Sequence, residues 1–212
     1  MKAMFKISLT KYTILLIISV FTVLVSSCTP GAEKAVDTSS KGTGDLANMV
    51  MEAIPGTSKQ YARQMDAVGN VEIVGFVEDG KKTGMWVQYT PERDIALINH
   101  YVNGLLEGTS MRMSFRNQVD LKLNYKQGKL DGPWTAFKFG KVIEQRTYVN
   151  DKLEGTATTY DDRTFKLKQE VQYKNGLQHG FFKYYDENGN VTLEYEYKNG
   201  EKVSGGMVEP GK

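Results

Sequence analysis

The side chains with catalytic potential are few and scattered. His100 and His179 are the only histidines. Glu194 and Glu196 stand two positions apart, so on a strand their carboxylates would lie about 7 Å apart on one face, a separation that glycoside hydrolysis can use. Their polar neighbours predict a solvated face, without the burial that tunes a catalytic acid. We therefore expect no enzyme, no catalytic residues, no metal site and no cofactor, and a carboxylate-based glycan hydrolase is the least favoured alternative.

The only cysteine, Cys28, follows a targeting segment. Three lysines precede an apolar run from Thr13 to Val25, which is shorter than the roughly 20 residues of a membrane-spanning helix and typical of a signal peptide. The sequence VSSC, ending at Cys28, resembles the lipobox of bacterial lipoproteins. The resemblance implies cleavage after residue 27 and acylation of Cys28. It implies a lipid-anchored protein of the bacterial cell envelope, on the periplasmic face of the outer membrane in a Gram-negative host.

The chain beyond the signal peptide is nearly neutral in charge. The whole chain has 27 basic and 25 acidic residues; without the three lysines of residues 1–27, 24 basic residues face 25 acidic ones, so nucleic acid is not an expected partner. Residues 28–44 are rich in small and polar residues and predict a flexible tether. In residues 45–68, Leu46, Met49, Val50 and Ile54 share one helical face before Pro55-Gly56, which predicts a short helical cap.

From residue 69 to residue 205 the sequence repeats. Each unit has an aromatic residue, a turn that mostly ends in glycine, and a second glycine about four positions later. The aromatic residues recur every 23 to 25 positions, which indicates one supersecondary unit per repeat. They are Phe76, Tyr101, Tyr125, Tyr148, Tyr173 and Tyr197.

Each unit has the features of a β-hairpin. Pairs such as Asn103-Gly104 tolerate the positive φ of tight turns, and VTLEYEY, residues 191–197, alternates apolar and polar residues as a half-buried strand does. The expected fold is all-β, an elongated antiparallel meander of about six units of about 24 residues with a short helical N-terminal segment and a tail at 206–212. The glycines assigned to the turns are Gly80, Gly84, Gly104, Gly108, Gly128, Gly132, Gly155, Gly176, Gly180 and Gly200.

The motif Tyr-x-Asn-Gly-x-x-x-Gly, clearest in YKNGLQHGFFKYYDENG from Tyr173, resembles the MORN repeat, and more closely its bacterial YwqK-type, antitoxin-like variant. The resemblance covers roughly residues 71–205. It implies an elongated single-layer sheet used as a scaffold for protein or membrane contact, without catalytic residues of its own. A signal peptide and a lipobox do not suit the partner of a cytosolic toxin, whereas a periplasmic immunity lipoprotein would fit them.

Aromatic residues at repeated positions form the candidate binding surface. They lie two and five positions after the second glycine, so on regular strands they face opposite sides; either both faces carry aromatic residues or each unit contains a β-bulge. The expected function is protein binding or scaffolding, and an envelope glycan is the alternative partner. The candidates are Trp86, Trp134 and Phe182, with Tyr89, Phe137 and Tyr185.

Overall fold

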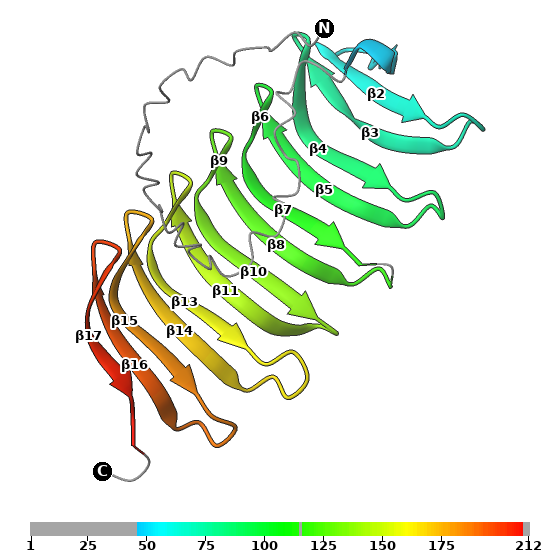
Figure 1. Cartoon of the computed structure of the whole chain (residues 1–212). Helices are drawn as coiled ribbons and strands as arrows, with labels where there is room; N and C mark the ends of the chain where they lie inside the picture. The colour runs from blue at the N-terminus through cyan, green and yellow to red at the C-terminus, as the bar shows by residue number, and fades with distance from the viewer. Residues whose placement is uncertain (1–45, 115, 210–212) are drawn as a thin grey trace, which may run out of the picture. The chain divides into compact units, whose positions relative to one another are not determined.

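A computed structural model describes residues 46–114 and 116–209 of the chain. They form one antiparallel sheet of 17 strands in which hairpins follow one another along the sequence (Figure 1). The expected all-β meander is therefore confirmed. The signal peptide, Cys28 and the tether lie outside the described residues.

The strands are short and evenly distributed. A 3-10 turn, η1 (Leu46–Asn48), comes before the first of them. The strands are β1 (Val50–Ala53), β2 (Lys59–Met65), β3 (Val71–Glu78), β4 (Lys81–Tyr89), β5 (Ile95–Val102), β6 (Leu105–Leu106), β7 (Gly108–Met113), β8 (Val119–Lys126), β9 (Lys129–Leu130), β10 (Gly132–Lys138), β11 (Lys141–Val149), β12 (Lys152–Leu153), β13 (Gly155–Tyr160), β14 (Leu167–Lys174), β15 (Leu177–Tyr185), β16 (Val191–Lys198) and β17 (Glu201–Met207).

The turns that join the strands along one side of the sheet are nearly identical. Each is a two-residue turn with positive φ at both central residues, the type I′ geometry that matches the twist of the flanking strands. Asp151 takes the position of glycine in one turn, with φ of 66°. All ten glycines assigned to the repeat turns also have positive φ. The six turns are centred on Asp79-Gly80, Asn103-Gly104, Gln127-Gly128, Asn150-Asp151, Asn175-Gly176 and Asn199-Gly200.

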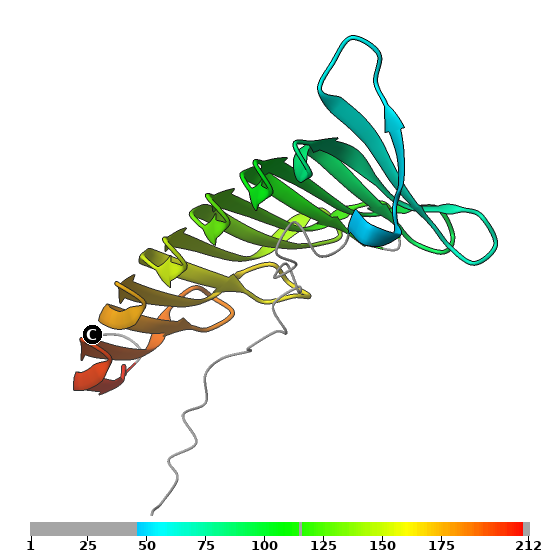
Figure 2. The same cartoon turned by 90° about the horizontal axis from the view of Figure 1, so that it is seen from above.

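The expected helical cap at 45–68 is wrong, because residues 50–53 and 59–65 are the strands β1 and β2. The turn between them is closed by the amide of Thr57, which donates to the carbonyl of Ile54 at 3.2 Å. Pairing with β3 buries Ala62 completely and sets the Tyr61 ring 6.0 Å from Phe76. Because helices this short are marginal on their own, the segment forms strands that pair with the open edge of β3 instead of a helix. The hairpin is seen at the N-terminal end of the sheet in Figure 2.

The sheet therefore begins at Val50 and ends at Met207, beyond the boundaries expected for the repeat region on both sides. Within the part of the chain that the structure describes, no helix is long and apolar enough to cross a membrane.

The buried residues lie almost entirely on one face of the sheet. Strand registers place Trp86 opposite Asn99, Ser110 opposite Leu123 and Trp134 opposite Arg146, all on this face. We call it the tryptophan face. Among the described residues, Val87 is the only buried one on the opposite face. The other residues with buried side chains are Ala62, Val77, Lys82, Trp86, Asn99, Tyr101, Leu106, Ser110, Leu121, Leu123, Tyr125, Trp134 and Val171.

Candidate binding surfaces

The Trp86 ring packs directly against the backbone of Gly75 on the tryptophan face. A Cβ atom built on Gly75 would lie 2.2 Å from Cδ2 of the ring, so only glycine leaves room for it. The indole Nε1 donates a hydrogen bond to the carbonyl oxygen of Phe76 at 3.1 Å, which satisfies the polar atom of the buried ring. Trp86 is 4% exposed, so its ring packs within the sheet and offers little surface to a partner.

Cations cover several rings of the tryptophan face. The Lys82 ammonium lies 4.6 Å from the Trp86 ring centroid, and the Arg146 guanidinium lies 4.6 Å from that of Trp134. Lys202 lies 3.7 Å from the Tyr195 centroid. Such contacts contribute about 0.5–2 kcal/mol each. Trp134 is 8% exposed beneath Arg146, which also forms an ion pair with Glu144.

Large and small residues alternate at the position two after the second glycine. The rings occur in the first, third and fifth units, as Trp86, Trp134 and Phe182, whereas Ser110 and Ala157 occupy the second and fourth. Phe182 is half-buried beside Tyr195, with ring centroids 6.1 Å apart. Because neighbouring strands lie only about 4.8 Å apart, small residues between the large ones give each ring room to lie flat.

The aromatic residues five positions after the second glycine lie on the opposite face. The Tyr185 hydroxyl donates to Glu170 Oε2 at 2.5 Å, and Glu170 pairs with Lys183, one residue from Phe182. Tyr89 lines a hollow with Val74, which pairs with Val87 on the opposite face. Alternation along β10 places Phe137 on that face too, because its neighbour but two, Trp134, lies on the tryptophan face. Each unit also contains a register shift immediately before this position, with the extra residue on the partner strand. Both faces therefore carry aromatic residues, and each unit also contains a register shift, so the two alternatives drawn from the sequence occur together. The shift does not bring the two sets of rings to one face.

These residues belong to a longer row along the loop-side edge of the opposite face, which we call the aromatic stripe. In six successive hairpins, from β2–β3 to β15–β16, an aromatic residue or a methionine pairs with a branched aliphatic residue just after the register shift. All but Met65 are half-buried, and Met65 is exposed. Met113 and Tyr160 were not among the sequence candidates, although they occupy the same position of the repeat. The pairs are Met65–Val71, Tyr89–Ile95, Met113–Val119, Phe137–Val142, Tyr160–Leu167 and Tyr185–Val191.

A polar cluster adjoins the C-terminal end of the stripe. Glu170, Lys183 and Glu194 occupy consecutive strands of one row, and the Lys183 ammonium lies 3.6 Å from a Glu194 oxygen. Burial, then the hydrogen bond and charge of Glu170 and the charge of Glu194, raise the pKa of Tyr185 to about 12. This phenol is therefore neutral over the physiological range and acts as a donor to Glu170.

The candidate catalytic residues do not converge. His100 is exposed on β5, while the Asn199 amide donates to His179 Nδ1 at 3.4 Å three units away. The Glu194 carboxylate faces Lys183, and Glu196 accepts a hydrogen bond from the Ser204 hydroxyl at 3.0 Å. No group of three potential metal ligands occurs among residues 46–114 and 116–209.

Acceptor side chains between the hairpins were not predicted from the sequence. In four units the residue before the second glycine accepts a hydrogen bond from the first turn residue of the next unit. Glu107 binds the Gln127 amide at 2.7 Å and Glu154 binds the Asn175 amide at 2.8 Å. Asp131 and His179 do the same for the amides of Asn150 and Asn199. The recurrence of acidic residues before the second glycine could have indicated these hydrogen bonds from the sequence.

Backbone hydrogen bonds run along the same edge. The second residue of each turn donates to a carbonyl of the preceding unit, for example Gly104 to Lys82 at 2.9 Å and Gly176 to Leu153 at 2.8 Å. Gly128, Asp151 and Gly200 make the equivalent bonds to Leu106, Leu130 and Gln178. We call this series of bonds the turn ladder. It joins each hairpin tip directly to the next one.

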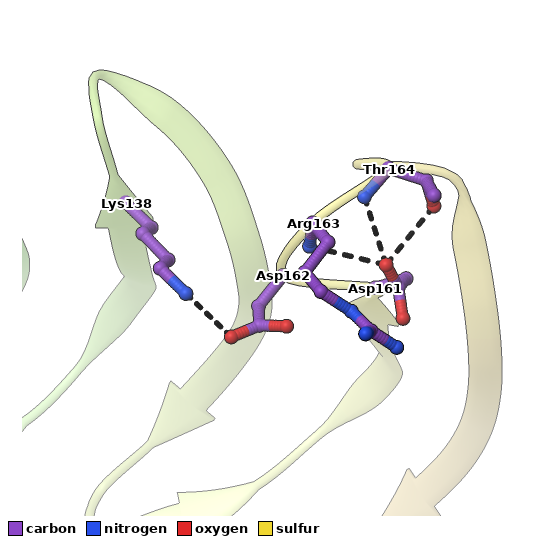
Figure 3. A network of polar contacts seen from close by, with 5 residues as sticks. All are labelled: Lys138, Asp161, Asp162, Arg163 and Thr164. Carbon is purple, nitrogen blue, oxygen red and sulfur yellow. Dashed lines mark hydrogen bonds and ion pairs between the residues drawn. The ribbon is translucent and has the colours of Figure 1, made fainter.

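Individual ion pairs and hydrogen bonds connect the loops at the other edge. Lys138 binds Asp162 of the next loop at 2.5 Å (Figure 3). Asp161 instead holds its own loop, accepting from the amides of Thr164 and Arg163 and from the Thr164 hydroxyl. These bonds lower the pKa of Asp161, and the Lys138 hydrogen bond lowers the pKa of Asp162. Both carboxylates are therefore ionised at neutral pH.

Comparison with known proteins does not assign a family. No model of a known protein family matches the sequence, and a search of curated proteins found no significant match. The functional argument therefore depends on this chain's own residues.

Proposed function

We propose that this protein is a non-catalytic, lipid-anchored scaffold of the cell envelope that binds another protein through the aromatic stripe. The observation that carries the proposal is the continuity of the stripe. Six successive hairpins contribute an apolar pair to one row, and all its members except the exposed Met65 stay half-buried instead of closing over one another as the rings of the tryptophan face do.

The chemistry of the stripe suits a protein interface. Tyr, Phe and Met are enriched at such interfaces because they supply apolar area together with adaptable or polar ends. At the N-terminal end, Tyr61, Val74 and Tyr89 line a hollow of about 420 Å³ with Arg93 beside it. A hollow lined by two tyrosines and two valines, together with the polar Asn70 and Arg93, can receive an anchoring side chain of a partner.

The membrane and family parts of the proposal depend on sequence features. The VSSC sequence supports acylation of Cys28, which would hold the sheet at a membrane surface. The Tyr-x-Asn-Gly turns, with their type I′ geometry, support assignment as a divergent member of the MORN-type repeats. A scaffold role agrees with both features because a repeated, rigid sheet presents many equivalent contact points along its length.

Site-specific photo-crosslinking in cells tests the proposal. The probe replaces Tyr160 in the stripe, and a matched probe replaces the exposed Thr156 four residues earlier on the same strand. Adducts are identified by mass spectrometry in the parent and in a Cys28→Ala variant.

One dominant protein adduct at position 160, absent at position 156 and lost with Cys28→Ala, is the expected result. Equal labelling at both positions would argue against the stripe as the interface. An adduct that persists in the Cys28→Ala variant would remove the lipid anchor from the proposal while leaving the protein contact in place.

A further inference from the structure

A second hollow, of about 650 Å³, lies at the loop-side edge near the C-terminal end of the sheet. Residues 161–168 form one wall and residues 184–187 form the other. The first wall differs from the other loops at this edge. The Asp161 amide bonds to the carbonyl of Lys166, five positions on, whereas the amides of Asp66, Thr90, Ser114 and Asp186 bond to carbonyls four positions on.

The two aspartates of the longer loop are hydrogen-bonded to donors other than the Arg163 guanidinium, although the Arg163 charge helps to lower the pKa of both. Asp161 accepts three hydrogen bonds from its own loop, and Asp162 binds Lys138 of the preceding unit. Figure 3 shows the Arg163 side chain directed away from Lys138. On the other wall, Asp186 likewise accepts hydrogen bonds from Asn188 and Asn190 within its own loop.

Three basic residues and one aspartate of the first wall line the hollow, so this wall has a net positive charge. The side chains of Arg163 and Lys168 line the hollow, and neither makes a hydrogen bond or ion pair with another residue of the described ranges. Lys166 spans the hollow and donates to the Glu187 carbonyl at 2.8 Å, which ties the two walls together. Tyr184, 36% exposed, borders the same space.

We propose that this hollow binds an acidic sugar, holding its carboxylate or phosphate between Arg163 and Lys168 and its ring beside Tyr184. The planar guanidinium of arginine matches both anions with two parallel hydrogen bonds. The Glu187 carboxylate on the facing wall is an acceptor for sugar hydroxyl groups and disfavours a second anion there. The site adjoins the C-terminal end of the aromatic stripe, because Leu167 and Tyr185 of the stripe also line the hollow.

Titration of the full chain, purified in detergent, with four probes tests this inference. Glucuronic acid and glucose 1-phosphate carry both the ring and the anion, glucose carries only the ring, and inorganic phosphate carries only the anion. Binding is measured by calorimetry and by amide chemical shifts. The two acidic sugars are expected to bind more tightly than glucose or phosphate and to shift the amides of residues 161–168 and 184–187.

Charge variants show whether the hollow itself is responsible. Arg163→Gln is expected to weaken binding of the acidic sugars by about tenfold or more, since it removes a charge-assisted contact. Lys174→Gln, a matched control on an exposed lysine of the same strand as Lys168, should leave binding unchanged. Equal weakening by both variants, no effect of Arg163→Gln, or phosphate binding as tightly as glucose 1-phosphate would each overturn the inference. Far-ultraviolet circular dichroism of each variant verifies that the sheet is intact.

Discussion

The two faces of the sheet use similar residues in different ways. On the tryptophan face, the large rings alternate with Gly75, Ser110 and Ala157, and cations lie over several of them, so the rings are buried by their own neighbours. On the opposite face, each aromatic residue or methionine of the stripe pairs with Val, Ile or Leu, and no small residue alternates with them along the row. The alternation of large and small residues along the row, and not the aromatic residue itself, therefore distinguishes the rings of the tryptophan face from those of the stripe.

Among the variants that test this comparison, the one that fills the space beneath Trp86 should lose the most stability. In Gly75→Ala the new Cβ would overlap the indole ring, so the ring must leave its site. We expect a loss of about 3–5 kcal/mol in the free energy of unfolding, similar to removal of a buried aromatic ring. Urea denaturation followed by tryptophan fluorescence measures it, in a Trp134→Phe background where Trp86 is the only tryptophan.

Gly206→Ala is the control for that experiment. Gly206 lies in β17, does not have positive φ, and has open space where the alanine Cβ would stand, with no atom within 4 Å. It should change the free energy of unfolding by about 0.5 kcal/mol or less. A similar loss in both variants would mean that the tryptophan face is not sensitive to the space under its ring.

Truncating one ring on each face compares the two surfaces directly. Trp134→Ala should lose about 3 kcal/mol of stability, because the ring is buried beneath Arg146. Phe137→Ala, three residues away, should lose about 1 kcal/mol, because its ring is only half-buried. Under the proposed function, Phe137→Ala should reduce crosslinking from position 160 more than Trp134→Ala does at equal folded fraction. The reverse order would place the partner on the tryptophan face.

Tyr185 gives the opposite face a pH-dependent signature. Its pKa is raised from 10 to about 12, so the folded protein favours the neutral phenol. The contribution of Tyr185 to stability is complete below pH 10 and is lost as the pH rises toward 12. Ultraviolet titration of tyrosinate should show a late-titrating group that Tyr185→Phe removes. If Tyr185→Phe leaves the titration curve unchanged, the hydrogen bond to Glu170 is absent in solution.

Loss of one side-chain acceptor beside the turn ladder should have a smaller effect on stability. Glu154→Ala leaves the Asn175 amide without its side-chain partner, and we expect a loss of about 1 kcal/mol. Glu201→Ala, at an exposed glutamate of β17, is the matched control and should be neutral. Thermal unfolding of both variants measures the difference, and identical midpoints would show that solvent replaces the acceptor at no cost.

His179 is the one member of the acceptor series that is neither Asp nor Glu. Its Nδ1 lies 3.4 Å from the Asn199 amide, a longer contact than those of the carboxylates. His179→Glu should restore a charge-assisted bond and raise the stability by about 0.5 kcal/mol. A lower unfolding midpoint would indicate that the imidazole contributes packing that a carboxylate does not replace.

The sequence was informative where a requirement is local. Positive φ at Asn103-Gly104 and the alternation of residues 191–197 depend on a few neighbouring residues, so turns and strands could be predicted. The strands β1 and β2 could not, because Ala62 owes its strand conformation to β3 and Gly75, which lie beyond any local pattern. The same limit applies to the candidate surface. Six aromatic residues were proposed as one set, whereas the registers separate them into a buried group with Trp86 and a half-open group with Tyr185.

The turn ladder also has a mechanical meaning. Because each hairpin tip bonds only to its neighbour, a pulling force applied at Met207 would be resisted by one unit at a time and not by the whole sheet. Releasing one unit of about 24 residues would lengthen the chain by roughly 80 Å. A partner that pulls against a membrane anchor would meet a series of similar, sequential resistances, so the protein could yield by one hairpin and still keep its remaining contacts.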